Sequence, residues 1–253
     1  MLRYALAVIG VWTSSAAFAG DGLSPRDIML EVIEAAGGSA WTDAKTLQLT
    51  GYGEFWPSGT EEGSYIADDY RMWRVFSGAR TAAHGPDGWV RIDSKAQGKV
   101  IFQIAFDGDE TWTQNGVMPL EEAAKTWANS FGFGIVREAL EDGFSLTRKP
   151  DDEVDGHASY FIEITDPEGA KTMFGIAKED YAIRYVGFNT PRGWHERRYD
   201  DFIMLDTPRW RQARSVRLFY NGVKTNHIYW QDTHVNAPLD KALFQYSSRE
   251  KTP

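Results

Sequence analysis

The stretch "HVNAPLDKALF", residues 234–244, lies near the C-terminal end of the chain and follows an apolar strand that finishes at Val235. Asn236 and Pro238 indicate a turn, because proline lacks the N–H that a sheet needs and fixes its own φ. Large apolar residues follow the turn, namely Leu239, Leu243 and Phe244. We expect this segment to anchor the end of the chain on the structure that precedes it.

The sequence before this anchor repeats with a period of two from Thr46 onward. In "TLQLTGYGEFW", residues 46–56, alternate positions place Leu47, Leu49 and Phe55 on one face. About eleven such segments follow one another, most of them separated by Gly, Pro, Asp or Asn. Short strands in succession favour an antiparallel meander, closed or half closed into a barrel, over alternating βαβ units.

A helix is expected before the first strand. Ser24 can cap it, Pro25 suits the first helical position, and Asp27 lies in the first turn, where a negative charge is favourable. Apolar residues recur every four positions until Gly37-Gly38, at Ile28, Val32 and Ala36. With the strands, this helix predicts an α+β fold.

A second helical region interrupts the strands at residues 118–143, and Gly132 and Gly134 are expected to divide it into two helices. Its apolar residues at helical spacing are Leu120, Ala124, Trp127, Phe131 and Ile135. Such a stripe is typical of a helix that plugs one side of a sheet. The alternative is a mobile lid that uses Trp127 and Phe131.

Two strands are apolar on both faces. "VIFQIAF", residues 100–106, places Phe102 and Ile104 on one face and Ile101 and Ala105 on the other, and "YAIRYVGF", residues 181–188, behaves alike. A sheet with one wet face alternates cleanly between apolar and polar residues. Either helices and a second sheet cover these strands, or one face lines an apolar cavity.

The N-terminal residues predict export. "MLRYALAVIGVWTSSAAFAG" has one basic residue, a short apolar run and Ala17-Phe18-Ala19, the pattern of a signal peptide at residues 1–19. The apolar run is too short to cross about 30 Å of hydrocarbon. Cleavage would leave residues 20–253 as a single periplasmic domain. With no Cys, the chain can carry neither a disulfide nor a cysteine-linked lipid anchor.

The charge balance argues against nucleic acid as a partner. Removing the signal removes Arg3 and no acid, which takes the net charge from −9 to −10. A chain with this net charge repels the phosphates of nucleic acids unless its basic residues cluster on the surface. The densest groups of basic residues in this sequence are small, so we do not expect nucleic acid binding.

The order of these segments resembles the superfamily of outer-membrane lipoprotein carriers, LolA and LolB, and their lipoprotein-sorting relatives. The resemblance covers a helix ending in "AAGGSAW", then "LQLTGYGEFW", a "FDGDETWTQNG" hairpin and the closing "HVNAPLDKALF". Asn236, Pro238 and Phe244 match the family's N-x-P-x-x-x-x-F tail. The chain departs from the carrier in its length and in Arg-aromatic segments such as "PRGWHERRYDDF", and without Cys it cannot be the lipid-anchored receptor.

The resemblance implies a half-open antiparallel barrel with helices closing one side and a lipid between them. It implies lipid or lipoprotein acyl chains as ligand, with an inner-membrane donor and an outer-membrane acceptor as partners. Other members bind different lipids or sense misplaced lipoproteins, so the ligand does not transfer with the fold. The candidate cavity residues are Trp73, Phe102, Ile104, Ile183 and Tyr185.

Enzyme chemistry has little support in the sequence. No metal-ligand spacing, nucleophile elbow or phosphate loop is present, and we expect no cofactor, metal or catalytic residue. The best remaining constellation is His195, Glu196, Asp200 and Asp201, which could supply acid/base chemistry or a weak metal site. Alternation would instead put His195, Arg197, Tyr199 and Asp201 on one face, apart from Glu196 and Asp200.

A third hypothesis is a module that binds protein rather than lipid. Arg209, Trp210 and Arg211, together with Trp194-His195, could form an exposed Arg/Trp hot spot. The alternative is that Arg stems cover Trp rings on an ordinary solvated surface.

Overall fold

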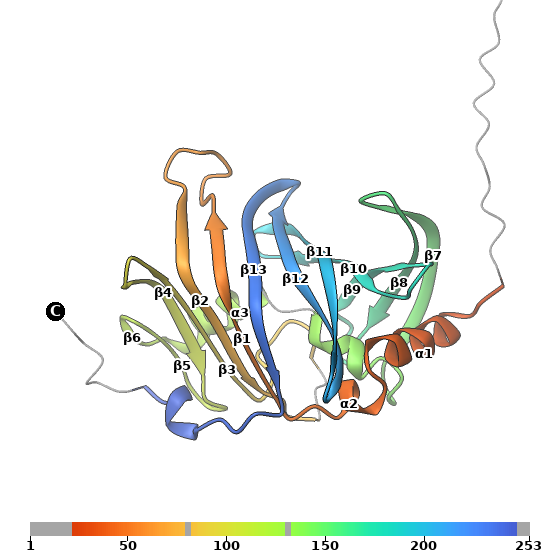
Figure 1. The fold of residues 1–253 in the computed structure, drawn as a ribbon, viewed down its shortest axis with the longest axis horizontal. Coiled ribbons are helices and arrows are strands. Elements are labelled where there is room, and N and C mark those ends of the chain that lie inside the picture. Colours follow the sequence, from red (N-terminus) through yellow and green to blue (C-terminus); the bar gives the residue numbers. More distant parts are fainter. Residues whose placement is uncertain (1–21, 79–81, 130–132, 247–253) are drawn as a thin grey trace, which may run out of the picture.

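The structure is a computed structural model that describes residues 22–78, 82–129 and 133–246, and its main feature is one curved antiparallel sheet (Figure 1). The signal segment and Phe131 lie outside these residues. The thirteen strands of the described chain are β1 (Thr46–Phe55), β2 (Tyr65–Val75), β3 (Trp89–Ala96), β4 (Lys99–Phe106), β5 (Thr111–Thr113), β6 (Gly116–Val117), β7 (Ser145–Val154), β8 (His157–Thr165), β9 (Lys171–Ala177), β10 (Ile183–Thr190), β11 (Gly193–Asp206), β12 (Arg209–Tyr220) and β13 (Val223–Val235).

The strand order is β6-β5-β4-β3-β2-β1-β13-β12-β11-β10-β9-β8-β7, so the first and last strands are neighbours in the middle of an open sheet. The fold is therefore mostly β. The expected count of about eleven strands was too low, because β6 is two residues long and β7, "SLTRKPDDEV", is polar and contains Pro150. An edge strand tolerates that composition, since one side makes no ladder hydrogen bonds.

The helices of the described residues are α1 (Pro25–Ala36), α2 (Ser39–Thr42) and α3 (Leu120–Ala128), with the 3₁₀ helices η1 (Phe133–Arg137) and η2 (Lys241–Phe244). The predicted cap of α1 is confirmed, because the Asp27 N–H donates to Ser24 Oγ at 3.1 Å. At the other end of α1, a Cβ on Gly37 would collide with the Arg209 carbonyl, so glycine lets the helix dock closely on the start of β12. Within the described ranges, each helix falls short of the length and apolarity needed to cross a bilayer.

The helical insertion crosses the open side of the sheet. It joins β6 to β7, which are consecutive in the chain but form opposite edges of the sheet. Of the expected apolar stripe in α3, Trp127 is buried as predicted, whereas Leu120 and Ala124 are exposed and Ala123 is buried in their place. Trp127 donates to Thr111 Oγ1 at 2.8 Å and packs with Val90 and Ile104. Trp127 is thus a fixed part of the packing in this structure.

A loop between β2 and β3 also crosses the concave side. The Ala83 N–H donates to Asp166 Oδ2 at 2.7 Å, and the His84 ring stacks on Phe188 of β10 with centroids 4.5 Å apart. Both contacts join the β3 half of the sheet to the β8–β10 half. Together with α1, α2 and η1, the loop encloses the main apolar core between itself and the sheet.

The predicted C-terminal anchor is confirmed at Phe244, while Leu239 and Leu243 are half-buried. Asn236 has a positive φ of 60°, and its Oδ1 accepts the Lys45 N–H at 2.7 Å, which ties the turn to the start of β1. Phe244 is 1% exposed and packs against Trp89, while its carbonyl accepts the Trp112 Nε1–H at 2.6 Å. The anchor holds the face of β3 and β5 that points away from the helices.

Candidate functional site

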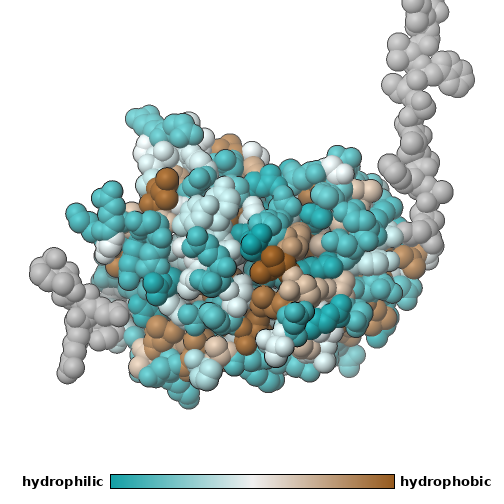
Figure 2. Space-filling view, in the orientation of Figure 1, coloured by the Kyte–Doolittle hydropathy of each residue, from teal (hydrophilic) through white to brown (hydrophobic). Residues whose placement is uncertain are grey.

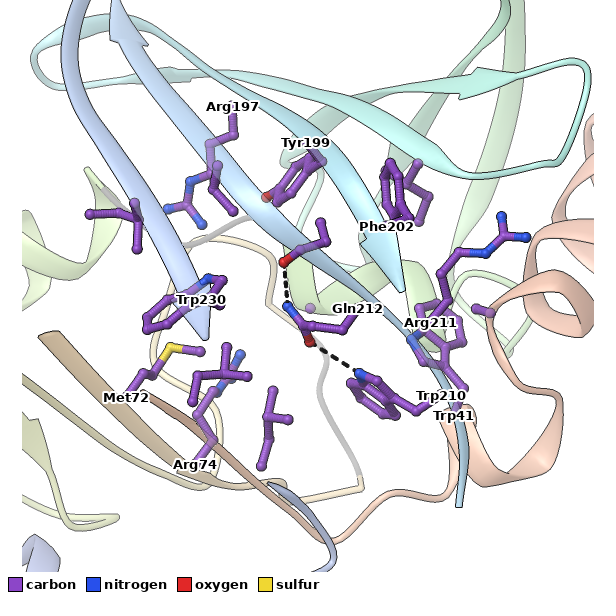
Figure 3. Close-up of a pocket in the computed structure, with 18 of the residues that line it drawn as sticks. Trp41, Met72, Arg74, Arg197, Tyr199, Phe202, Trp210, Arg211, Gln212 and Trp230 are labelled. Carbon is purple, nitrogen blue, oxygen red and sulfur yellow. Dashed lines mark hydrogen bonds between the residues drawn. The ribbon is translucent and has the colours of Figure 1, made fainter. Parts of the chain in front are cut away.

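A half-open cavity of about 270 Å³ lies between the concave face of the sheet and the helices (Figure 3). Seven strands and the segments that cross the sheet contribute to its walls. The apolar and aromatic lining residues are Val32, Ala36, Trp41, Leu47, Leu49, Tyr70, Met72, Phe76, Ile92, Tyr181, Ala182, Ile183, Tyr199, Phe202, Trp210, Ala213, Val216, Leu218, Ile228 and Trp230. Such a lining, with a few polar groups, is typical of ligand pockets.

The cavity opens where β12 and β13 separate. These strands pair only from Ser215 opposite Tyr229 to the hairpin turn. The residues of β12 before Ser215 pair with β11 alone, and the residues of β13 after Tyr229 pair with β1 alone. The lining residues Trp210, Gln212 and Trp230 flank the gap (Figure 3). Figure 2 shows apolar surface in the middle of this side of the molecule, over the same gap.

The polar groups beside the opening are hydrogen-bonded to one another. Trp210 Nε1 donates to Gln212 Oε1 at 3.1 Å, and Gln212 Nε2 donates to the Ala213 carbonyl at 2.7 Å. Farther in, the Tyr70 and Trp230 rings lie 5.4 Å apart. Burial raises the pKa of Tyr70 to about 12, so its phenol stays protonated at neutral pH. The wall is therefore uncharged at these positions.

The charged residues that line the cavity are all arginines: Arg74, Arg137, Arg197 and Arg211. Two of them face an acid, since Arg211 lies 3.6 Å from Asp180 Oδ2 and Arg74 lies 3.7 Å from Asp87 Oδ2. Arg137 lies over the Phe76 ring at 3.6 Å. No Asp or Glu is among the lining residues in the described part of the chain.

His195 and Arg197 form a pair on the cavity side of β11. His195 is completely buried, and its Nε2 accepts the Arg197 Nε–H at 2.9 Å. Burial, with the adjacent Arg197 charge second, lowers the pKa of His195 to about 2, so the ring is neutral. In the range that the structure covers, no carboxylate oxygen lies within 4.0 Å of the Arg197 guanidinium.

The structure separates the predicted acid/base constellation. Glu196 lies on the opposite face, where its Oε1 accepts the Trp194 Nε1–H at 3.1 Å. Alternation was expected to place Asp201 beside Arg197 and Tyr199, and this was wrong. Asp201 has a positive φ of 51°, so alternation breaks, Phe202 lines the cavity instead, and Asp201 is exposed with Arg214 at 2.8 Å.

Three of the predicted cavity residues lie on the concave face. Ile183 lines the cavity directly. Ile104 is opposite Ile92 in the β3–β4 ladder and is buried against α3, adjacent to the cavity rather than in its wall. Phe102 shares that face but lies near the end of the β3–β4 hairpin and is 39% exposed.

The other two predicted residues lie on the opposite face. Trp73 follows the cavity residue Met72, and the Arg91 guanidinium lies 5.8 Å from its ring. Tyr185 packs against Phe161 and accepts a hydrogen bond from Trp194 Nε1 at 3.3 Å. Both are part of packing outside the cavity.

The expected Arg/Trp hot spot is not an exposed cluster. Trp210 is 5% exposed and lines the cavity, and Arg209 Nη1 donates to the Glu34 carbonyl of α1 at 2.9 Å. Sequence reasoning instead missed Tyr70, Arg197 and Trp230 as cavity residues. The alternation of Arg with aromatic residues in β11 and β12 was the sequence signal that could have indicated these cavity residues.

No model of a known protein family and no curated protein sequence matches the chain. Solved structures do match it, at low identity. An outer membrane lipoprotein-sorting protein domain from Vibrio parahaemolyticus is 11% identical, with a TM-score of 0.53 over 86% of this chain and 94% of that one. A LolA superfamily protein from Nitrosomonas europaea is 10% identical, with a TM-score of 0.54 over 88% and 98%.

A DUF1329 family protein from Desulfovibrio piger is similar to the same extent, with 11% identity and a TM-score of 0.51 over 88% of this chain and 98% of that one. At these identities the likeness defines the fold and not the ligand. The chain therefore has a LolA-like fold, and the resemblance predicted from its sequence is confirmed at that level.

Proposed function

We propose that this chain is a periplasmic binding protein that sequesters the acyl chain of a lipid or lipoprotein in the cavity between sheet and helices. The observation that carries the proposal is the half-open apolar cavity itself. Each methylene moved from water into such a site stabilises the complex by about 0.8 kcal/mol. The fold likeness to a lipoprotein-sorting domain supports the same ligand class.

The volume favours one chain rather than several. About 270 Å³ lies just below the usual volume of ligand pockets, which is roughly 300–1,000 Å³. A carrier of this kind works by binding and release, with a donor at the inner membrane and an acceptor at the outer membrane. The burial of neutral His195 away from Glu196 favours binding over acid/base catalysis.

The first test is to extract the protein, purified without detergent, into organic solvent and to analyse the extract by mass spectrometry. We expect an acyl-bearing compound in near-stoichiometric amount. An empty extract, together with no uptake of a fluorescent fatty acid by the pure protein, would refute the proposal.

A pair of matched variants locates the binding site. Ile183→Asp puts an unpartnered charge into the cavity wall and should abolish uptake of the probe, because a buried charge without a partner is costly. Ile66→Asp is the control, since Ile66 is 60% exposed on β2. If circular dichroism shows that Ile183→Asp is unfolded, Ala213→Trp provides a second test by filling the cavity with an apolar ring.

A further inference from the structure

The cavity combines an apolar lining with positive charge in a chain whose net charge is −9. We propose that its ligand carries one acidic group, a carboxylate or a phosphate on a single apolar chain, and that Arg197 binds this group. The inference rests on the proposed function, because it names the ligand class of the same cavity.

Arg197 is distinguished from two other cavity arginines by its surroundings. Arg211 donates to the Asp180 carbonyl at 2.7 Å and also faces the Asp180 carboxylate, and Arg74 faces the buried Asp87. Arg197 donates its Nε–H to a neutral ring instead. A charge in a partly apolar site is stabilised when an opposite charge pairs with it. The ligand would supply that charge here.

The backbone of β11 keeps the nearest candidate acid out of the cavity. Regular alternation would have placed the Asp201 carboxylate on the same face as Arg197 and Tyr199. The positive φ of Asp201 turns its side chain to the outside, where Arg214 pairs with it. The chain thus contains an acid two positions beyond Tyr199 and directs it away from the cavity cation.

The surroundings of Arg197 orient its guanidinium toward the cavity. Its Nε is held by His195, and its side chain lines the same cavity as Trp230 of β13 (Figure 3). The phenol of Tyr70 lies close enough for the Arg197 charge to oppose the rise that burial causes in its pKa. An acid bound here would meet a fixed cation in the cavity wall, with its chain lying along the apolar residues.

The test compares a fluorescent fatty acid, cis-parinaric acid, with its uncharged methyl ester at pH 7.5. Both have the same chain, so the ratio of their affinities isolates the acidic group. The wild type should bind the acid at least tenfold more tightly than the ester. Arg197→Met should reduce that preference to less than threefold, and Arg197→Lys should keep part of it because the charge remains.

Arg198→Met is the matched control. Arg198 is the next residue of β11, points to the other face and pairs with Asp155 at 2.9 Å, so the acid preference should be unchanged. Displacement of the bound probe by oleate, by oleoyl lysophosphatidate and by uncharged monoolein then separates a carboxylate from a phosphate as the preferred head group.

The two proposals fail in different ways. If the wild type binds acid and ester equally, or if Arg197→Met loses both alike while folded, the acidic-ligand inference is wrong and lipid sequestration stands. If neither probe binds the wild type, the proposed function itself fails. If Arg197→Met does not fold, the acid-to-ester ratio of the wild type and of Arg197→Lys decides.

Discussion

Two arginines set among aromatic rings on opposite faces of the sheet have different surroundings. Arg91, on the outer face of β3, lies 5.1 Å from the Trp112 ring and makes two hydrogen bonds to Asp93, at 2.9 and 3.0 Å. It also donates to the Leu243 carbonyl at 2.8 Å. Arg197, on the cavity face of β11, has a neutral histidine in place of the carboxylate.

The difference lies in what covers each arginine. The C-terminal tail closes over Arg91, so its charge is compensated within the chain and the site is structural. Arg197 instead lines a half-open cavity, and the adjoining strands β12 and β13 do not pair between Ser215 and the start of β12. The same residue type therefore serves stability on one face and, in our proposal, recognition on the other.

The largest expected effect comes from removing the C-terminal tail that covers Arg91. Truncation after Pro238 should destabilise the protein by at least about 3–5 kcal/mol, the usual cost of losing one buried Phe, because Phe244 is lost along with the bonds to Arg91 and Trp112. Urea unfolding followed by Trp fluorescence measures the change. Leu120→Ala, at an 83% exposed position, is the control. An unchanged midpoint would show that the tail does not hold this face together.

The next effect comes from removing the charge partner. Asp93→Asn leaves Arg91 buried without a carboxylate and should cost about 3 kcal/mol. Asp201→Asn is the matched variant, since its pair with Arg214 is exposed and should be worth less than about 0.5 kcal/mol. If the two variants had equal unfolding free energies, the buried Arg91–Asp93 pair would contribute no more to stability than the exposed Arg214–Asp201 pair, and the prediction would be wrong.

A smaller effect should appear as the pH falls. The pKa of His195 is about 2 in the folded chain and 6.5 in the reference state, so the folded state prefers the neutral ring. The stability from this residue is complete above pH 6.5 and is lost as the pH falls toward 2. At pH 5 the loss is about 2 kcal/mol, at 1.36 kcal/mol per pH unit.

Chemical denaturation at pH 7.5 and pH 5 tests this expectation. His195→Gln should have a flatter dependence of unfolding free energy on pH than the wild type, whereas His234→Gln, at an exposed position, should keep the wild-type slope. The same slope in both variants would mean that other groups cause the acid sensitivity.

The smallest expected effect is on stability at Arg197. Arg197→Met breaks no ion pair within the described chain but removes the donor to buried His195 Nε2, so it should lower the unfolding free energy by only about 1–2 kcal/mol. Arg91→Met strands Asp93 and should cost about 3 kcal/mol. A large loss at Arg197, comparable with that at Arg91, would indicate a structural role for both arginines.

Much of the fold could be predicted because its signals are local. The cap of α1 joins residues three apart, and the alternation of β1 reports Leu47, Leu49 and Phe55 on one face. The anchor at Phe244 was readable because a turn signal preceded large apolar residues. Edge strand β7 was missed because its partner covers one side only, and its sequence carries no apolar alternation.

The cavity itself was harder to predict because a period of two does not say which face becomes concave. Alternation would also put Ile183 and Tyr185 on one face, yet a register shift between them in the β9–β10 ladder leaves Ile183 in the cavity wall and Tyr185 packed outside it. Trp73 and Met72 are adjacent and point to opposite sides. The direction of curvature depends on how all thirteen strands pair, which no single segment encodes.

The sequence by itself determined the strand-rich composition, the capped first helix and the closing anchor, since each depends on residues close together in the chain. Only the tertiary structure decided where β12 leaves β13, that Asp201 turns outward, and that four arginines meet one apolar cavity. The physical reason is that these features arise from contacts between strands distant in sequence. A bulge or a lost ladder pair moves a side chain to the other face without changing the pattern of residues.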